Sequence, residues 1–310
     1  MGIFFQGYTL GGILAVIFLM AVLLLINEVT RKSKTVSIIA YCVLPVLLAV
    51  LIFSNVLSSP TGKTWFPWVK VVSALLGVYG FMLIRFTKLG KSKFAVIYPI
   101  SILAINIAEA VYREFEIFMQ YKTLQVDAAG IVVLGGPWNI LNAIAGILCI
   151  VTLTGFAGIK VSKDKSKDMI WPDMTWIYIV GYTLWNFAYV YNCLSTRAMY
   201  AGFTILTAAI VAEIFFKRGA WLQHRAQTLA LYAMFSLSVD FQRSEFFRII
   251  PIYKESNLMT ISVISFTFNV GMVLFMIYTI RKHKKNPLKE DIYVDTKYYK
   301  KTMEINNLNM

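Results

Sequence analysis

Long apolar runs separated by short polar segments follow one another from residue 7 to residue 280 of the chain. Each run is about 20 residues long, the length that an α-helix needs to cross the hydrocarbon core of a bilayer. A transmembrane β-barrel would instead show ten-residue strands of alternating polarity, which this sequence lacks. The pattern therefore predicts an all-α, polytopic transmembrane helix bundle of about nine spans. The predicted spans are 7–29, 35–57, 66–86, 94–118, 138–159, 174–195, 198–216, 226–244 and 258–280.

Basic residues are concentrated in every second connection between these spans. The connections after the first, third, fifth, seventh and ninth spans, together with the C-terminal tail, hold 22 of the 30 Lys and Arg residues. Positively charged connections of membrane proteins stay in the cytoplasm. We therefore predict an N-terminus outside and a cytoplasmic C-terminus, with basic loops that contact anionic membrane lipid. The net charge of +14 then reflects topology, and we expect no nucleic-acid partner.

The composition agrees with a membrane protein. Hydrophobic residues make up 58% of the chain and charged residues 15%, whereas soluble domains carry about 25% charged residues. Short connections favour one transmembrane helical domain over residues 1–285. Residues 286–310 are polar, and we expect a partly disordered cytoplasmic tail there. The longest outer connection, 119–137, has an apolar centre and is either a plain loop or a re-entrant or capping element.

The fourth predicted span carries most of the charge within the membrane region. Asn106, Glu109, Arg113, Glu116 and Gln120 follow one another at spacings of three and four residues, which places them on one helical stripe. Glu109 precedes Arg113 by four residues, and we expect these two side chains to form an intrahelical ion pair. Charges inside a bilayer are costly, so this stripe is the first candidate for a functional site.

The eighth predicted span, 226–244, repeats this arrangement. It is the weakest of the nine, because Asp240 and Arg243 lie near its end. These two residues are three positions apart and share a helical face. From their positions along the two spans, we expect Asp240 to lie at the same depth as Glu109. The two helices would then contribute to one polar pocket.

Amide and aromatic side chains line faces of the fifth and sixth predicted spans and extend this pocket. The combination predicts an outward-facing site for a small polar or zwitterionic solute, whose cationic group would contact the aromatic rings. Hydrogen bonding between helices is the alternative role for each of these side chains. The candidate ligand-binding residues are Asn106, Glu109, Arg113, Asn139, Asn142, Trp185, Asn186, Tyr189, Asn192, Asp240 and Arg243.

Known catalytic and metal-binding motifs are absent from the sequence. It contains no HExxH, no GxSxG and no Walker lysine motif. Cys42, Cys149 and Cys193 are isolated in apolar runs, and His224 and His283 fall in predicted cytoplasmic connections. The sequence therefore leads to no catalytic residue, no metal and no cofactor.

Two stretches carry a resemblance to other proteins. They are Gly136–Asn142, with the sequence GPWNILN, and Tyr182–Asn192, with the sequence YTLWNFAYVYN. Through them the chain resembles a family of uncharacterised bacterial polytopic membrane proteins of unknown function. The resemblance covers most of the membrane region. It implies a bacterial plasma-membrane location and no particular activity, so it assigns no site residue.

A transporter or channel-like protein, with the outer pocket as its entry site, is the first functional hypothesis. A ligand-binding membrane sensor, or a subunit of a larger membrane complex, would use the same pocket for recognition. An intramembrane enzyme acting on lipid or envelope substrates, with Glu109 or Asp240 as base, is the third. The inner halves of the spans are mostly apolar, which counts against a carrier because a carrier needs a route to the cytoplasmic side.

Overall fold

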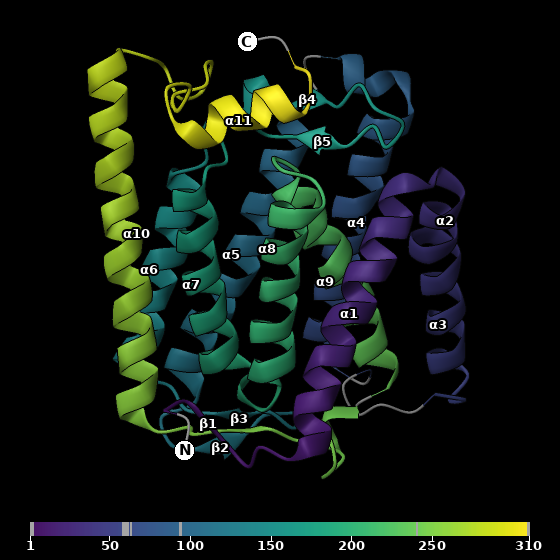
Figure 1. The fold of residues 1–310 in the computed structure, drawn as a ribbon. Helices are drawn as coiled ribbons and strands as arrows, with labels where there is room; N and C mark the ends of the chain where they lie inside the picture. The colour runs from purple at the N-terminus through teal and green to yellow at the C-terminus, as the bar shows by residue number, and fades with distance from the viewer. Residues whose placement is uncertain (1–2, 58–61, 63, 93–94, 240, 309–310) are drawn as a thin grey trace.

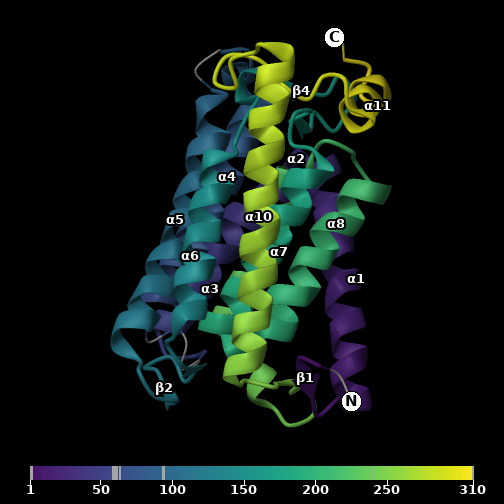
Figure 2. The same cartoon turned by 90° about the vertical axis from the view of Figure 1, so that its left-hand side faces the viewer.

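The computed structural model describes residues 3–57, 62, 64–92, 95–239 and 241–308. This part of the chain is mainly helical, and its long helices run side by side between the two ends of one bundle (Figure 1). A helix overlaps each predicted span, and the predicted helical class is confirmed in that the described chain is mostly helical. The chain begins at one end of the bundle and finishes at the other, as the two perpendicular views show (Figures 1 and 2).

Most helix boundaries lie close to those of the predicted spans, but the helix of the fifth span ends at Val151, well before the predicted end at residue 159. The second span is divided into three pieces, with a π-helical turn, η1, just before Pro45, whose ring cannot take part in regular α-helical hydrogen bonding. The elements are α1 Leu10–Lys32, α2 Lys34–Ile38, η1 Ile39–Val43, α3 Leu44–Phe53, α4 Trp65–Phe86, η3 Lys88–Lys91, α5 Ile97–Gln120, α6 Pro137–Val151, η4 Phe156–Gly158, α7 Trp176–Cys193, η5 Ser195–Arg197, η6 Ala198–Thr204, α8 Ile205–Phe215, α9 Trp221–Ser238, η7 Phe241–Arg243, α10 Glu255–His283 and α11 Lys297–Ile305.

Within the described residues, five helical segments are long and apolar enough to cross a membrane. α5, α7 and α9 are not among them, because they carry charged and polar side chains into the interior of the bundle. α6 is apolar but only 15 residues long. A membrane location is thus indicated by five helices, and nine crossings remain a prediction. The five segments are 10–32, 34–53, 65–86, 195–215 and 255–283.

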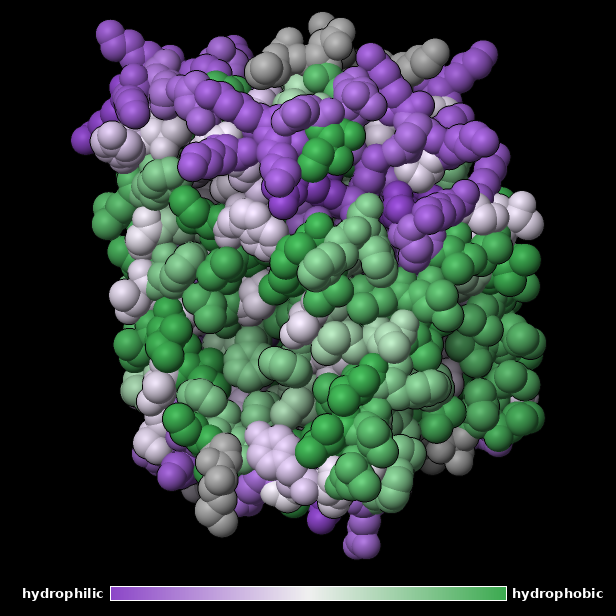
Figure 3. Space-filling model, in the orientation of Figure 1, coloured by the Kyte–Doolittle hydropathy of each residue, from purple (hydrophilic) through white to green (hydrophobic). Residues whose placement is uncertain are grey.

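The side surface of the bundle is apolar. On the face in Figure 3, a broad hydrophobic zone covers the middle of the bundle, and a hydrophilic layer covers the end where α11 lies. Phe18 of α1, Val50 of α3 and Leu274 of α10 are each more than half exposed. Soluble monomers rarely expose apolar surface of this extent, whereas hydrocarbon covers it at no cost.

Three short antiparallel strand pairs lie at the ends of the bundle. β1 (Phe5–Gln6) pairs with β6 (Ile250–Pro251) and so joins the N-terminal residues to the segment before α10. At the other end, β4 (Lys160–Val161) pairs with β5 (Met169–Ile170) in the connection between α6 and α7 (Figure 1).

The third pair makes the outer connection 119–137 a hairpin of β2 (Gln125–Val126) and β3 (Val132–Val133). Asp127 Oδ1 accepts hydrogen bonds from two backbone N–H groups of its turn, both at 2.9 Å. Ile131 and Val133 are buried against the end of the bundle. The apolar centre of this segment is therefore explained by a packed hairpin that caps the end of the bundle, in agreement with the capping alternative.

Residues 286–308 are folded, in contrast to the expected disordered tail. α11 lies across the end of the bundle (Figure 1), and the Tyr298 hydroxyl donates to Glu213 Oε1 of α8 at 2.5 Å. Tyr293 and Met303 are also buried. The average polarity of the segment hides these apolar and aromatic contacts, which hold it in place.

α9 begins at Trp221, before the predicted start at residue 226, and ends at Ser238, before the predicted end at residue 244. His224 and Arg225 were expected in a cytoplasmic connection, but both are buried in the first turns of this helix. His224 has a buried neighbour, because its Nδ1 lies 2.9 Å from Asn27 Nδ2. The corrected boundary brings Arg225 into the interior of the bundle.

Candidate functional site

A cavity of about 120 Å³ lies inside the bundle among α4, α5, α7, η6, α8 and α9. Tyr182, Tyr189 and Phe66 contribute aromatic side chains to its wall, and aliphatic residues complete most of the rest. Lys70 and Arg225 are basic residues of the same wall. None of the described lining residues is acidic, and the polar groups of the wall are guanidinium, ammonium, amide, hydroxyl and phenol groups.

A second cavity of about 30 Å³ lies beside the first and shares with it the lining residues Asn106, Tyr182, Arg225 and Leu229. On α4, Phe66 lines the larger cavity and Phe81 lines the smaller cavity. On the neighbouring helix α9, Leu237 lines the larger cavity and Leu222 lines the smaller cavity. The 15 residues from Phe66 to Phe81 correspond to about 22 Å of helix. The two cavities therefore succeed one another along the axis of the bundle, and Arg225 lines both.

Arg225 is the most unusual residue of this site, because only 4% of it is exposed and it has no ion pair within the described residues. Its Nη2 donates to Asn186 Oδ1 at 3.2 Å, and its guanidinium carbon lies 6.0 Å from the centre of the Tyr182 ring. Nε and Nη1 are buried and have no hydrogen-bond partner in the described chain. Burying a charge without a partner costs several kcal/mol. The absence of acceptors for Nε and Nη1 therefore lowers the stability of the folded protein.

Lys70 is paired, in contrast to Arg225. Its Nζ lies 2.8 Å from Glu109 Oε2 of α5. The predicted Glu109–Arg113 pair is therefore wrong. Arg113 instead contacts Glu116 at 2.6 Å and Asp127 of the hairpin at 2.5 Å. The predicted stripe of α5 therefore forms two separate sets of ion pairs. Glu109 pairs with Lys70 of the neighbouring helix, whereas Arg113 lies closer to the end of the bundle and pairs there.

Three predicted ligand-binding residues, Asn106, Asn186 and Tyr189, line the cavity. Trp185 lies behind this wall, where its ring stacks on Tyr189 with 6.2 Å between ring centroids and an interplanar angle of 15°. Its Nε1–H donates to the backbone oxygen of Asn142 at 3.1 Å. The structure thus brings part of the predicted set together, and a role of these residues in ligand binding remains a prediction.

Asn139, Asn142 and Asn192 meet at a different place, around the buried carboxylate of Glu114. Asn139 Nδ2 donates to Glu114 Oε2 at 2.6 Å, and Asn142 Nδ2 donates to Oε1 at 2.7 Å. Asn192 adds a longer contact of 3.4 Å to Oε1. Among the described residues, no cation pairs with Glu114. The three amides thus stabilise an internal carboxylate and link α5, α6 and α7.

The remaining two predicted site residues lie after α9. Asp240 is outside the described residues, so its expected depth beside Glu109 stays untested. The backbone of Arg243 ends the short turn η7, beyond the last residue of α9. The predicted eighth span therefore does not continue as one helix to residue 244.

Sequence analysis missed three residues of the interior, Lys70, Glu114 and Arg225. A signal for Glu114 was present, because it follows Ile107 by seven residues and precedes Ile117 by three, on the buried face of α5. Lys70 and Arg225 each lie within two turns of a helix start, where basic residues are usually assigned to a membrane interface. Their inward direction depends on the helix rotation, which the local pattern did not reveal.

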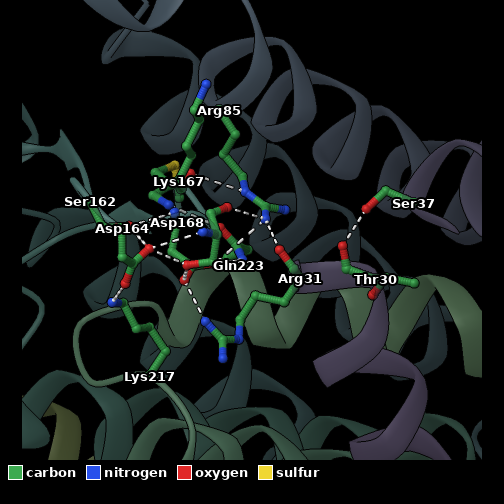
Figure 4. A network of polar contacts seen from close by, with 12 residues as sticks. Thr30, Arg31, Ser37, Arg85, Ser162, Asp164, Lys167, Asp168, Lys217 and Gln223 are labelled. Carbon is green, nitrogen blue, oxygen red and sulfur yellow. Dashed lines mark hydrogen bonds and ion pairs between the residues drawn. The ribbon is translucent and has the colours of Figure 1, made fainter. Parts of the chain in front are cut away.

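A buried polar network surrounds Asp168 (Figure 4). It includes Arg85 and Gln223, which follow Phe81 and Leu222 of the smaller cavity along α4 and α9. Asp168 is fully buried; it accepts from Arg31 Nη1 at 2.7 Å and from Gln223 Nε2 at 2.8 Å. Arg85 Nη2 lies 3.5 Å from Asp168 Oδ1 and donates to the backbone oxygen of Arg31 at 2.6 Å. This network joins α1, α4 and α9 to the β4–β5 connection and fixes the start of α9.

In the part of the chain that the structure describes, no three His, Cys, Asp or Glu side chains come together as a metal site.

The sequence as a whole was compared with known proteins. The profile of a family of unknown function, DUF5692, matches residues 7–305. The chain belongs to this family. The expected membership of an uncharacterised family is therefore confirmed, while its bacterial origin stays a prediction. No curated protein and no solved structure matches the chain.

Proposed function

We propose that this member of the DUF5692 family is a polytopic protein of the bacterial plasma membrane that carries a small polar or zwitterionic solute. The observation that carries the proposal is the succession of two cavities along α4 and α9. The part of α4 that lines the two cavities is about 22 Å long. Lys70, Asn186 and Arg225 supply polar groups to the larger one, and polar groups inside a membrane bundle commonly mark a solute pathway.

The proposed orientation has nine crossings, with the N-terminus outside and the C-terminus in the cytoplasm. The hydrophilic layer of Figure 3 lies at the end where Figure 1 places β4, β5 and α11, and this end holds the basic-rich connections. That distribution supports the positive-inside orientation. The larger cavity reaches Phe66, in the first turn of α4, at the opposite end. It would therefore be on the outer side.

A membrane receptor is the second candidate, because the proposed cytoplasmic end of the pathway is closed. The network around Asp168 lies beyond the smaller cavity, and α11 covers that end of the bundle (Figures 1 and 4). A carrier must open this end during transport, whereas a receptor need only change it when a solute binds. The same cavity thus serves either function.

Uptake into proteoliposomes separates the two candidates. A thermal-shift screen of the purified protein first identifies a stabilising solute, because a ligand that binds the folded state raises its apparent stability. A carrier should then show saturable uptake that falls at least tenfold in Asn186→Ala. The control Arg281→Lys changes an exposed residue of α10 and should transport normally. Saturable binding without uptake supports the receptor, and the absence of both contradicts the proposal.

A further inference from the structure

We infer that the cavity recognises the carboxylate of a small organic monoanion through Arg225. The inference rests on the proposed binding of a solute in this cavity and names the chemical class of that solute. Its starting point is the pair of buried guanidinium atoms, Nε and Nη1, that have no acceptor in the described chain.

The charge of the cavity wall favours an anion. Lys70 and Glu109 balance one another at 2.8 Å, which leaves the positive charge of Arg225 uncompensated by a described carboxylate. Arg197 also lines the wall and has an interaction of its own. An anionic group beside Arg225 would therefore offset the unfavourable burial of its charge.

A carboxylate fits this position better than a phosphate dianion. One uncompensated cation matches one negative charge, whereas a dianion needs a second. The planar guanidinium group also matches a carboxylate in size and geometry. The N–H of Nε or of Nη1 is parallel to the second N–H of Nη2, and such a pair can meet the two oxygens.

The guanidinium group is held in place before a ligand binds. Asn186 accepts from Nη2 at 3.2 Å, and the Tyr182 ring lies 6.0 Å from the guanidinium carbon. Both neighbours are uncharged, so they orient Arg225 and leave its charge available. Such pre-organisation lowers the entropy cost of binding.

The rest of the wall indicates the body of the ligand. Val190, Ile205, Leu229 and Ala233 are aliphatic residues of the larger cavity. The buried hydroxyl of Tyr189 has no partner in the described chain and supplies one further polar contact. The cavity of about 120 Å³ suits a compact apolar body such as a phenyl ring or a short alkyl chain. The ligand class is thus an aromatic or short-chain aliphatic carboxylic acid, and the same carboxylate chemistry occurs in fatty acids.

The first experiment compares acids with their neutral isosteres by thermal shift and calorimetry on the purified protein. Benzoate and hexanoate should bind saturably, and benzamide and hexanamide at least tenfold more weakly. Oleate in mixed micelles tests the lipid source of the same group. A response to oleate alone, or equal binding of acids and amides, overturns the inference. Binding of neutral or cationic solutes alone also overturns it but leaves the proposed function standing.

The second experiment tests the assigned residue. Arg225→Met removes the charge at similar length and should weaken benzoate or hexanoate binding at least tenfold, while the exposed control Arg281→Met should bind normally. Arg225→Lys retains the charge without the planar fork and should give an intermediate loss, which tests the site if the Met variant does not fold. Unchanged affinity in both Arg225 variants overturns the inference. Carboxylate binding without liposome uptake supports it and contradicts only the carrier function.

Discussion

Arg31 Nη1 lies 2.7 Å from Asp168 Oδ2, although 137 residues separate the two in the chain. Asp168 also accepts from Gln223, two residues before Arg225 at the cavity. The pair therefore ties α1 and the β4–β5 connection to the start of α9 (Figure 4). These contacts fix the start of α9 and thereby the position of Arg225 in the interior of the bundle.

We predict that Asp168→Asn strongly destabilises the bundle. The substitution leaves Arg31 buried without its carboxylate partner, which costs about 3–5 kcal/mol. The apparent unfolding temperature in detergent measures the effect. Asp164→Asn in the same connection is the control, because the Asp164 side chain is 48% exposed and asparagine keeps the Oδ1 that accepts from Ser162 and Ser166, so we expect a smaller loss. Equal losses in the two variants would show that Asp168 has no special role.

A pH-dependent contribution to stability is expected from Asp173, in the connection before α7. Burial, together with the nearby Asp291, raises its pKa from 3.8 to about 6, although the Tyr293 N–H and the Thr154 hydroxyl donate to it. The folded protein then binds more protons than the unfolded chain between these values, so this stabilisation is present at low pH and is lost as the pH rises from about 4 to about 6.

The Asp173→Asn variant isolates this contribution. Unfolding temperatures of the wild type and the variant should be measured from pH 4 to pH 7. The wild type should lose stability relative to the variant as the pH rises through this window, and the difference should level off above it. A constant difference would mean that the pKa of Asp173 is the same in the folded and unfolded states.

The positions of the helices could be predicted because an apolar run marks the residues that are buried or in contact with lipid, and this information lies within the run itself. α1, α3 and α10 illustrate this, since they carry long exposed apolar faces. α9 was misplaced because Gln223 and His224 are polar and suggested a connection. Both are satisfied by partners from distant segments, Asp168 and Asn27, and such long-range hydrogen bonds leave no local pattern.

The candidate site could be predicted only in part for the same reason. Helical spacing placed Asn106, Asn186 and Tyr189 on inward faces, and all three line the cavity. Spacing within one helix favoured Arg113 as the partner of Glu109. The actual partner, Lys70, comes from the neighbouring helix, and a pair between helices depends on their packing and rotation.

Cysteine labelling should reveal the proposed orientation. Ala128 in the β2–β3 hairpin and Lys163 in the β4–β5 connection are both exposed, at opposite ends of the bundle (Figure 1). In a Cys42→Ala background, an impermeant maleimide on intact cells should label Ala128→Cys and leave Lys163→Cys unlabelled until the membrane is permeabilised. The native Cys149 and Cys193 are buried and should remain unreactive. The reverse labelling would invert the proposed topology.

Two asparagine variants should separate the cavity from the internal amide cluster. Asn142→Ala removes a donor at 2.7 Å from the buried Glu114 carboxylate, and we expect a loss of stability of about 2 kcal/mol with unchanged ligand affinity. Asn186→Ala frees the guanidinium of Arg225 and should lower the affinity for a cavity ligand at least tenfold. Calorimetry and thermal unfolding on the same samples provide both readouts. An affinity loss in Asn142→Ala would extend the site to the Glu114 cluster.

Two buried arginines should respond in opposite ways to the same substitution when no ligand is present. Arg225 lacks acceptors for Nε and Nη1, so Arg225→Met removes an uncompensated charge and should raise the apparent unfolding temperature. Arg85 donates to the backbone oxygens of Arg31 and Ser166 and lies beside Asp168, so Arg85→Met should lower it. Thermal unfolding of the two variants in one detergent is the measurement. If Arg225→Met is destabilised as much as Arg85→Met, Arg225 is a structural residue with an internal partner. A rise for Arg225→Met alone means that the bundle retains this charge at a cost to its own stability, as expected of a residue kept for a ligand.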